Sequence, residues 1–461
     1  MKVEVSVGQW MAVATVTLAL MTALLGGAVW IVERIDSTRK GLEREIRSVS
    51  NALTAARDTA GTQRGAMREQ MDEAQGRGIH ETVAAYLERS ALEVALNADG
   101  GLEGPATEWF RTEAAEAQFV FIGEEHDVRE VPILVGALWR ELVPLGYKHV
   151  AIEAGPWLGD RLDKFARFAD QQALADFRGA TLPRLPNNSV PPISEEDIAF
   201  YRRLGSVSGP HRRSAAPLIW GLDAEYRAAP LLKRLLELSP RLATLQAAQS
   251  LLEQVGAAER SGDYNTRAFR GAIEQVIQQA RAEPETELRY ILDALRWRIA
   301  DPREHTSRNL KKELFLRQYD AAKEEGEPKP RVMFRLGAYH AARGLMHDFG
   351  SSTLANFVAE LAIAERTRML NLAIVNCQDT SPGDFPRPCT WEQQRALRPF
   401  RSAAVADWTL FDLRGLRAPL RQARLNALQS YPAGWEYWNL VMSFDAVLLL
   451  GRSEPSRFAG E

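Results

Sequence analysis

The stretch FVFIGEEHD, residues 119–127, joins four apolar residues to a glycine and a cluster of acidic residues around one histidine. Short uninterrupted apolar runs are typical of strands that helices cover on both faces of a sheet. Open α/β sheets bind their ligands at the carboxyl ends of such strands, which is where Glu124 and His126 stand. The stretch therefore predicts a buried parallel strand that leads into a candidate functional site.

Six further runs of the same kind follow along the chain: HVAI (149–152), LIWGL (218–222), RVMFRL (331–336), LNLAIV (370–375), WTLFDL (408–413) and DAVLLL (445–450). Segments with the three- and four-residue apolar spacing of helices separate many of them. We therefore expect an α/β fold, with a mostly parallel sheet sandwiched by helices, over residues 79–455. Residues 228–328 carry only helical patterns, which predicts a helical insertion in this domain.

Four of these runs lead directly into ionisable residues. FVFI leads into Glu124 and His126, HVAI into Glu153, LIWGL into Asp223 and Glu225, and RVMFRL into Gly337 and His340. Because the carboxyl ends of parallel strands meet at the same edge of a sheet, we expect these side chains to share one pocket. Two imidazoles and several carboxylates can support general acid–base catalysis or a metal site.

The first 78 residues have a different organisation. Met11–Val32 is an uncharged, apolar run about as long as the ~20 residues that a helix needs to cross a bilayer, so residues 1–32 are predicted to hold a transmembrane helix. Residues 33–78 are interpreted as a helical stalk and a linker. Apolar residues recur there at heptad spacing: Leu42, Ile46, Val49, Leu53 and Ala56. This pattern indicates either a coiled coil that forms a homodimer or a single amphipathic helix.

Two signals disagree about the side of the membrane on which the C-terminal domain lies. Lys and Arg cluster after the apolar run, at residues 34–47, which favours the cytoplasm under the positive-inside rule. Cys377 and Cys389 bracket the turn-rich loop CQDTSPGDFPRPC in a chain with no other cysteine, which favours a disulfide and an oxidising compartment. We expect a single-pass membrane protein whose C-terminal domain is extracytoplasmic.

Composition and missing motifs exclude several classes of function. The formal net charge is −3, so no broad positive surface is available for nucleic acid. The sequence has no G-x-S-x-G elbow, which argues against a serine-hydrolase triad. It also lacks a Walker loop and the G-x-G-x-x-G fingerprint of dinucleotide-binding folds. We expect a small molecule as the substrate and no nucleic acid as a partner.

The same residues resemble a known superfamily. The G-E-x-H element (Gly123, Glu124, His126), the segment AIEAG with Glu153, the segment GLDAEY and the later LGAYHAARG with His340 resemble the erythromycin esterases and the ChaN–TIKI proteins of haem uptake and proteolysis. The resemblance implies a hydrolase that acts on an ester, lactone or amide. In that scheme His126 is the base that activates water, Glu124 and Glu153 adjust its basicity, and His340 is the second acid–base group.

Two details extend and modify this resemblance. The segment REHTSRNLKKELF resembles an esterase helix that presents Arg303 and Asn309 to the site, so we expect these two residues, with Asp223 and Glu225, to bind substrate. The esterases continue their motif as G-E-x-T/S-H-G, whereas GEEHD is closer to the ChaN-like form.

The ChaN-like form leaves an alternative open. The protein would then bind haem or iron, without hydrolysis, through a histidine or Tyr339. The hydrolase scheme requires no cofactor, although the histidines and glutamates could also hold a divalent metal.

Overall fold

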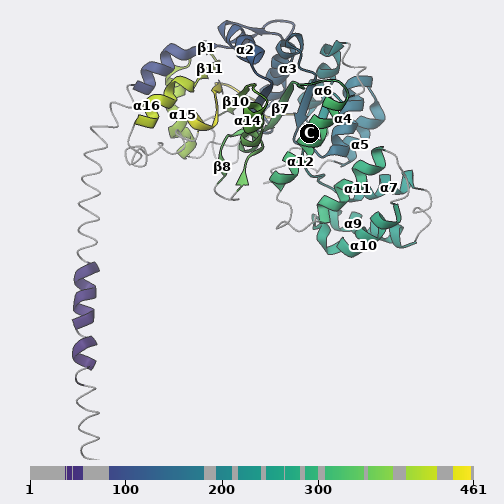
Figure 1. The fold of residues 1–461 in the computed structure, drawn as a ribbon, viewed down its shortest axis with the longest axis horizontal. Helices are drawn as coiled ribbons and strands as arrows, with labels where there is room; N and C mark the ends of the chain where they lie inside the picture. Colours follow the sequence, from purple (N-terminus) through teal and green to yellow (C-terminus); the bar gives the residue numbers. More distant parts are fainter. Residues whose placement is uncertain are drawn as a thin grey trace, which may run out of the picture. The chain divides into compact units, whose positions relative to one another are not determined.

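The computed structural model describes residues 37, 39–43, 45–54, 82–180, 194–209, 216–239, 246–263, 265–280, 286–299, 307–346, 351–376, 391–422 and 440–457. The chain divides into two compact units, Met1–Gln75 and Gly76–Glu461, and each is considered by itself (Figure 1). The predicted membrane span Met11–Val32 and the loop from Cys377 to Cys389 lie outside the described residues.

The described part of the first unit is helical at residues 39–43 and 45–54. The side chains at the heptad positions are exposed by 57% to 68%: Leu42, Ile46, Val49 and Leu53. An apolar stripe on a helix is usually covered by another surface, whereas this one is exposed. Among the described residues, no helix has the length and apolar character to span a bilayer.

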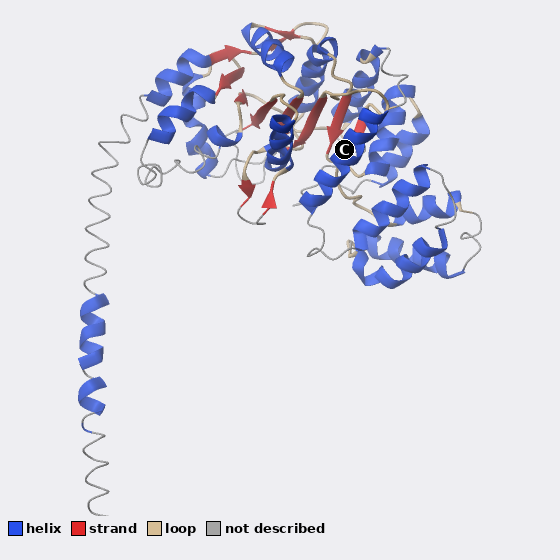
Figure 2. Ribbon diagram, in the orientation of Figure 1, coloured by secondary structure: helices blue, strands red, loops and turns tan. Residues whose placement is uncertain are grey.

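The second unit is built on an eight-stranded sheet, counted over the described residues (Figure 2). Its spatial order is β1 (Ala91–Glu93), β11 (Trp408–Asp412), β12 (Ala446–Leu450), β10 (Met369–Asn376), β4 (Phe119–Glu124), β7 (Val332–Gly337), β5 (His149–Ile152) and β6 (Ile219–Gly221). The six strands from β12 to β6 are parallel, while β1 and β11 pair antiparallel at one end. The predicted mostly parallel α/β sheet is confirmed.

Each of the seven apolar runs forms a strand, because helices cover both faces of the sheet. In β4, Val120 and Ile122 face one buried core, whereas Phe119 and Phe121 face the other. The sequence patterns missed β1, which is only three residues long and half-buried at an edge. Such a strand is too short to show a period of two. The small pairs β2 (Ala95–Leu96) with β3 (Leu102–Glu103), and β8 (Leu345–Met346) with β9 (Ser351–Ser352), were also not predicted.

Helices form a layer on each face of the sheet (Figure 1). One layer contains α2 (Pro105–Glu116), α3 (Glu130–Leu142), α4 (Pro156–Phe168), α5 (Gln171–Ala180) and α6 (Glu195–Val207). The other contains α12 (Ser307–Glu324), α13 (Ala338–Ala341), α14 (Leu354–Ala364), α15 (Trp391–Ala403) and α16 (Arg417–Gln422). Ser194 is the N-cap of α6 and forms a capping box with Asp197.

The segment 228–328 is helical where the structure describes it. Helices α7 (Ala229–Leu238), α9 (Gln246–Arg260), α10 (Arg270–Ala280) and α11 (Thr286–Ile299) pack on one another, and α11 also packs on α4. Helix α12 differs from these four, because Phe315 packs against Phe119 and Phe334 of the sheet. The last helix of the segment is therefore part of the sheet's own covering layer.

Candidate active site

The carboxyl end of β4 places His126 between two carboxylates. Nδ1 of His126 lies 3.5 Å from Oε1 of Glu124, and Nε2 lies 3.8 Å from Oε2 of Glu153, at the end of β5. The imidazole side chain is 25% exposed, whereas Glu124 is buried. His126 is therefore accessible to a water molecule or substrate from one side and charge-stabilised from the other.

A second imidazole contacts the same carboxylate. His340 belongs to α13, the single helical turn that follows β7, and its Nε2 lies 2.9 Å from Oε1 of Glu153. The other oxygen of Glu153 accepts a hydrogen bond of 2.9 Å from the backbone N–H of Gly337. Glu153 thus joins His126 and His340. With Glu124, these residues lie together at the edge of the sheet where the strand ends were expected to converge.

Gly337 allows this close approach because it has no side chain. A Cβ atom at this position would lie 3.0 Å from Nε2 of His126 and 3.2 Å from Oε2 of Glu153. Both distances are shorter than an ordinary van der Waals contact. The glycine between β7 and α13 therefore lets three elements meet at one point.

Sequence analysis missed a buried lysine at the site. Lys311 of α12 is 2% exposed and forms ion pairs with Asp223 and, at 3.8 Å, with Oε1 of Glu153. An unpaired buried ammonium group would be costly, so these carboxylates hold Lys311 in place. The sequence contains a signal for this burial. Lys311 is four residues before the buried Phe315 and eight before the buried Tyr319, so it lies on the apolar face of its helix.

A buried arginine is the second residue that was missed. Arg335 lies inside β7, and its Nε donates a hydrogen bond of 2.7 Å to Oε2 of Glu124. Its Nη2 donates a second bond, also of 2.7 Å, to Oδ1 of Asp197 in α6. A single charge within the apolar run VMFRL was the sequence signal. Arg335 fixes Glu124 with one oxygen facing His126.

These charges shift the protonation equilibria of the site. Burial alone would lower the pKa of His126, but Glu124 and Glu153 outweigh it and raise that pKa above its ordinary value. Burial would raise the pKa of Glu124, yet Arg335 and His126 hold it below its usual range. Glu153 behaves likewise: the hydrogen bond from His340 and the charge of Lys311 outweigh burial and lower its pKa.

The four residues expected to bind substrate have different positions. Asp223 pairs with Lys311 near Glu153. Glu225 is fully buried, and its Oε1 accepts hydrogen bonds from the backbone N–H groups of Trp157 (2.7 Å) and Leu158 (3.2 Å), so it caps the start of α4. Asn309 is exposed on α12, and Arg303 lies outside the described residues. Of the four, Asp223 is the one that the structure brings close to Glu153, through their shared partner Lys311.

The described residues do not form a metal-ligand set. No group of three or more His, Cys, Asp or Glu side chains in the described ranges is arranged to hold a metal ion. The Nε2 atoms of His126 and His340 both face Glu153 instead, and Tyr339, the alternative iron ligand, is 72% exposed. The side chains form a network of ion pairs around Glu153.

The mostly parallel α/β sheet, covered by helices on both faces, defines the fold class of the protein. The fold is that of the erythromycin esterases. It is similar to a solved structure of the erythromycin esterase EreC in its open conformation, with 13% identity and a TM-score of 0.50, over 77% of this chain and 95% of that chain. It is also similar to a solved succinoglycan biosynthesis protein, with 13% identity and a TM-score of 0.51, over 82% of this chain and 99% of that one.

Comparisons of sequence add nothing to this assignment. No protein-family model matches the sequence. No curated protein matches it either. At 13% identity the structural likeness establishes the fold alone, and the erythromycin-esterase-like fold that the motifs predicted is confirmed. The resemblance to ChaN and TIKI proteins stays a prediction.

Proposed function

We propose that the protein is a membrane-anchored hydrolase that opens an ester, lactone or amide with water activated by His126. One observation carries the proposal: two partly exposed imidazoles contact opposite oxygens of Glu153, and Glu124 lies behind one of them. The erythromycin-esterase-like fold supports hydrolysis as the reaction class. The substrate is a carbonyl compound small enough to reach the carboxyl edge of the sheet.

The reaction proceeds through side chains of this chain. Neutral His126 removes a proton from water as the water oxygen attacks the carbonyl carbon, and Glu124 and Glu153 stabilise the imidazolium that forms. The tetrahedral intermediate then loses its leaving group, whose oxygen or nitrogen takes a proton from protonated His340. Release of the proton from His126 to solvent and uptake of a proton by His340 restore the starting state.

The mechanism has a defined pH dependence. His126 must be neutral to act as a base, and its pKa is raised above the ordinary value. Turnover should therefore increase with pH through a value above about 6.5, the usual pKa of histidine.

The test measures hydrolysis of a panel of small esters, lactones and amides by two proteins. These are the wild-type full chain and the His126→Ala variant, both in detergent. General-base catalysis contributes about 10²- to 10⁴-fold, so turnover should fall by that factor. Tyr339→Phe is the matched control, because the exposed Tyr339 side chain has no role in this scheme and should leave turnover unchanged. Equal turnover in wild type and His126→Ala would refute the proposal.

The same preparation tests the alternative of haem or iron binding. Titration with haem should give no Soret band that depends on Tyr339 or His340 if the hydrolase proposal is correct. A wild-type protein without turnover, but with such a band that Tyr339→Phe abolishes, would establish the binding protein instead.

The membrane part of the proposal rests on the sequence of Met11–Val32, which is long and apolar enough to cross a bilayer. We propose that the C-terminal domain is extracytoplasmic, because the Cys377–Cys389 loop suits an oxidising compartment. We also propose that the exposed stripe Leu42, Ile46, Val49 and Leu53 pairs with the same stripe of a second copy. Its alternating steps of four and three residues fit a coiled coil.

A further inference from the structure

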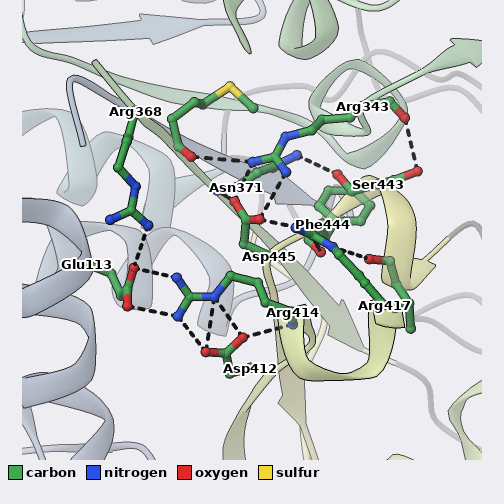
Figure 3. Close-up of polar contacts among 12 residues, drawn as sticks. Glu113, Arg343, Arg368, Asn371, Asp412, Arg414, Arg417, Ser443, Phe444 and Asp445 are labelled. Atoms are coloured by element: carbon green, nitrogen blue, oxygen red, sulfur yellow. Dashed lines mark hydrogen bonds and ion pairs between the residues drawn. The ribbon is translucent and has the colours of Figure 1, made fainter. Parts of the chain in front are cut away.

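Two buried polar residues, Asn371 of β10 and Asp445 just before β12, are not used by the catalytic scheme. Asn371 has no exposed surface although it lies within an apolar central strand, and Asp445 is also buried. Burying an amide and a carboxylate costs free energy unless both form hydrogen bonds. Figure 3 shows the hydrogen bonds that Asn371 and Asp445 form.

Asn371 binds the backbone next to His340. Its Nδ2 donates a hydrogen bond of 2.6 Å to the carbonyl oxygen of Ala341, the last residue of α13, and one of 2.8 Å to the carbonyl oxygen of Ser443. Its own backbone N–H donates a bond of 3.0 Å to Oδ2 of Asp445. One side chain thus connects the middle of β10 to the end of the helical turn that carries His340.

Asp445 holds the residues that follow this turn. It pairs with Arg343, whose Nη1 donates a bond of 3.0 Å to Oδ1, and with Arg417, whose Nη2 donates one of 2.8 Å to the same oxygen (Figure 3). The backbone N–H of Arg343 donates to the carbonyl oxygen of Ser443 at 3.2 Å, and the Ser443 hydroxyl donates to the carbonyl oxygen of Arg343 at 3.1 Å. The chain from 341 to 343 is therefore tied to 443–445.

The helical turn α13 depends on these contacts, because it is too short to be stable by itself. A single helical turn is unstable without external contacts. At its start, the N–H of Gly337 donates to Glu153, and at its end Asn371 binds Ala341. We propose that Asn371 and Asp445 are positioning residues that fix His340 Nε2 against Glu153 from the opposite side of the turn. This inference rests on the proposed role of His340.

The kinetic test compares Asn371→Ala with Leu372→Ala in the full chain. Leu372 is the next residue of β10, is also buried, and faces the opposite core, so it is a control for general loss of packing. Misplacing a catalytic group by about 1 Å can cost about 10²-fold in rate. We expect Asn371→Ala to lower kcat ten- to a hundred-fold with little change in KM. Leu372→Ala should lower the melting temperature but retain kcat. Equal kcat in wild type and Asn371→Ala would overturn the inference.

A second readout is independent of turnover. The NMR chemical shifts of the His340 imidazole should change in Asn371→Ala and stay unchanged in Leu372→Ala, because only the first variant releases α13. Arg343→Gln is a milder variant that keeps the fold if Asn371→Ala does not, and it should change the same chemical shifts less. A wild type without hydrolysis, but with these changes in the variants, would refute the proposed function and keep the inference. Unchanged His340 chemical shifts in Asn371→Ala and Arg343→Gln would refute the inference itself.

Discussion

At the scale of single residues, Gly337 is the glycine at which an added side chain would meet both His126 and Glu153. A methyl group there would lie 3.0 Å from His126 Nε2 and 3.2 Å from Glu153 Oε2, so Gly337→Ala should push the imidazole away from Glu153. We expect turnover to fall about 10²-fold, with a small effect on the melting temperature. Gly271→Ala is the control, since a Cβ at that helical position meets no atom within 4 Å. Unchanged turnover in Gly337→Ala would mean that His126 does not act from this position.

Glu225 gives a residue-scale prediction about pH and stability. Burial raises its pKa to about 8, so the folded protein holds this carboxyl neutral up to that pH. A raised pKa contributes stability at low pH that is lost as pH rises from the unfolded value of about 4.3 to about 8. Glu225→Gln keeps the acceptor for Trp157 and Leu158 but has no charge to lose.

The free energy of unfolding of Glu225→Gln should therefore increase relative to that of the wild type as the pH rises from 5 to 8, by about 1 kcal/mol per pH unit. The difference in melting temperature between the two proteins should increase over the same range. Glu325→Gln, which changes an exposed carboxyl, is the control. A difference between Glu225→Gln and wild type that is the same at both pH values would contradict the raised pKa.

At the scale of elements, the sequence predicted best the strands that are buried on both faces of the sheet. Apart from His149 and Arg335, strands β4, β5 and β7 bury apolar side chains on both faces up to their ends. Glu124, Glu153 and His340 lie at or just after these ends, so both the strands and the convergence of the site were predictable. The partners of these residues were less accessible to prediction. Lys311 meets Glu153 only because α12 packs across the sheet from a distant part of the chain. No local pattern specifies that docking.

The stalk helix provides a prediction at the same scale. If Leu42, Ile46, Val49 and Leu53 pair with a second copy, Ile46→Asp buries a charge at the centre of the seam and should dissociate the dimer. Light scattering of the full chain in detergent should then change from a dimer to a monomer. Ser48→Asp adds the same charge at an exposed position outside the stripe and should leave the dimer intact. A wild-type monomer would support the single amphipathic helix.

At the scale of the whole molecule, the site depends on strand order rather than on sequence order. Glu124, Glu153 and His340 are far apart in the chain, but β4, β7 and β5 are neighbours in the sheet, so the three strand ends adjoin. The apolar runs predict that these strands exist, but not which of them pair. Long-range pairing is decided by how helices such as α3 and α12 pack on the two faces, and this information is spread over the whole domain.

The proposed membrane anchor, Met11–Val32, gives a prediction at the same scale. An arginine at the centre of a transmembrane helix costs about 2.5–3.5 kcal/mol of insertion free energy. Leu20→Arg should therefore move much of the full chain from the alkali-resistant membrane fraction to the supernatant, whereas Ser48→Arg, with the same charge in the stalk, should not. Turnover should survive in the released Leu20→Arg chain, because residues 76–461 form a compact unit that includes every site residue. Membrane attachment that is unchanged by Leu20→Arg would show that Met11–Val32 is not the anchor.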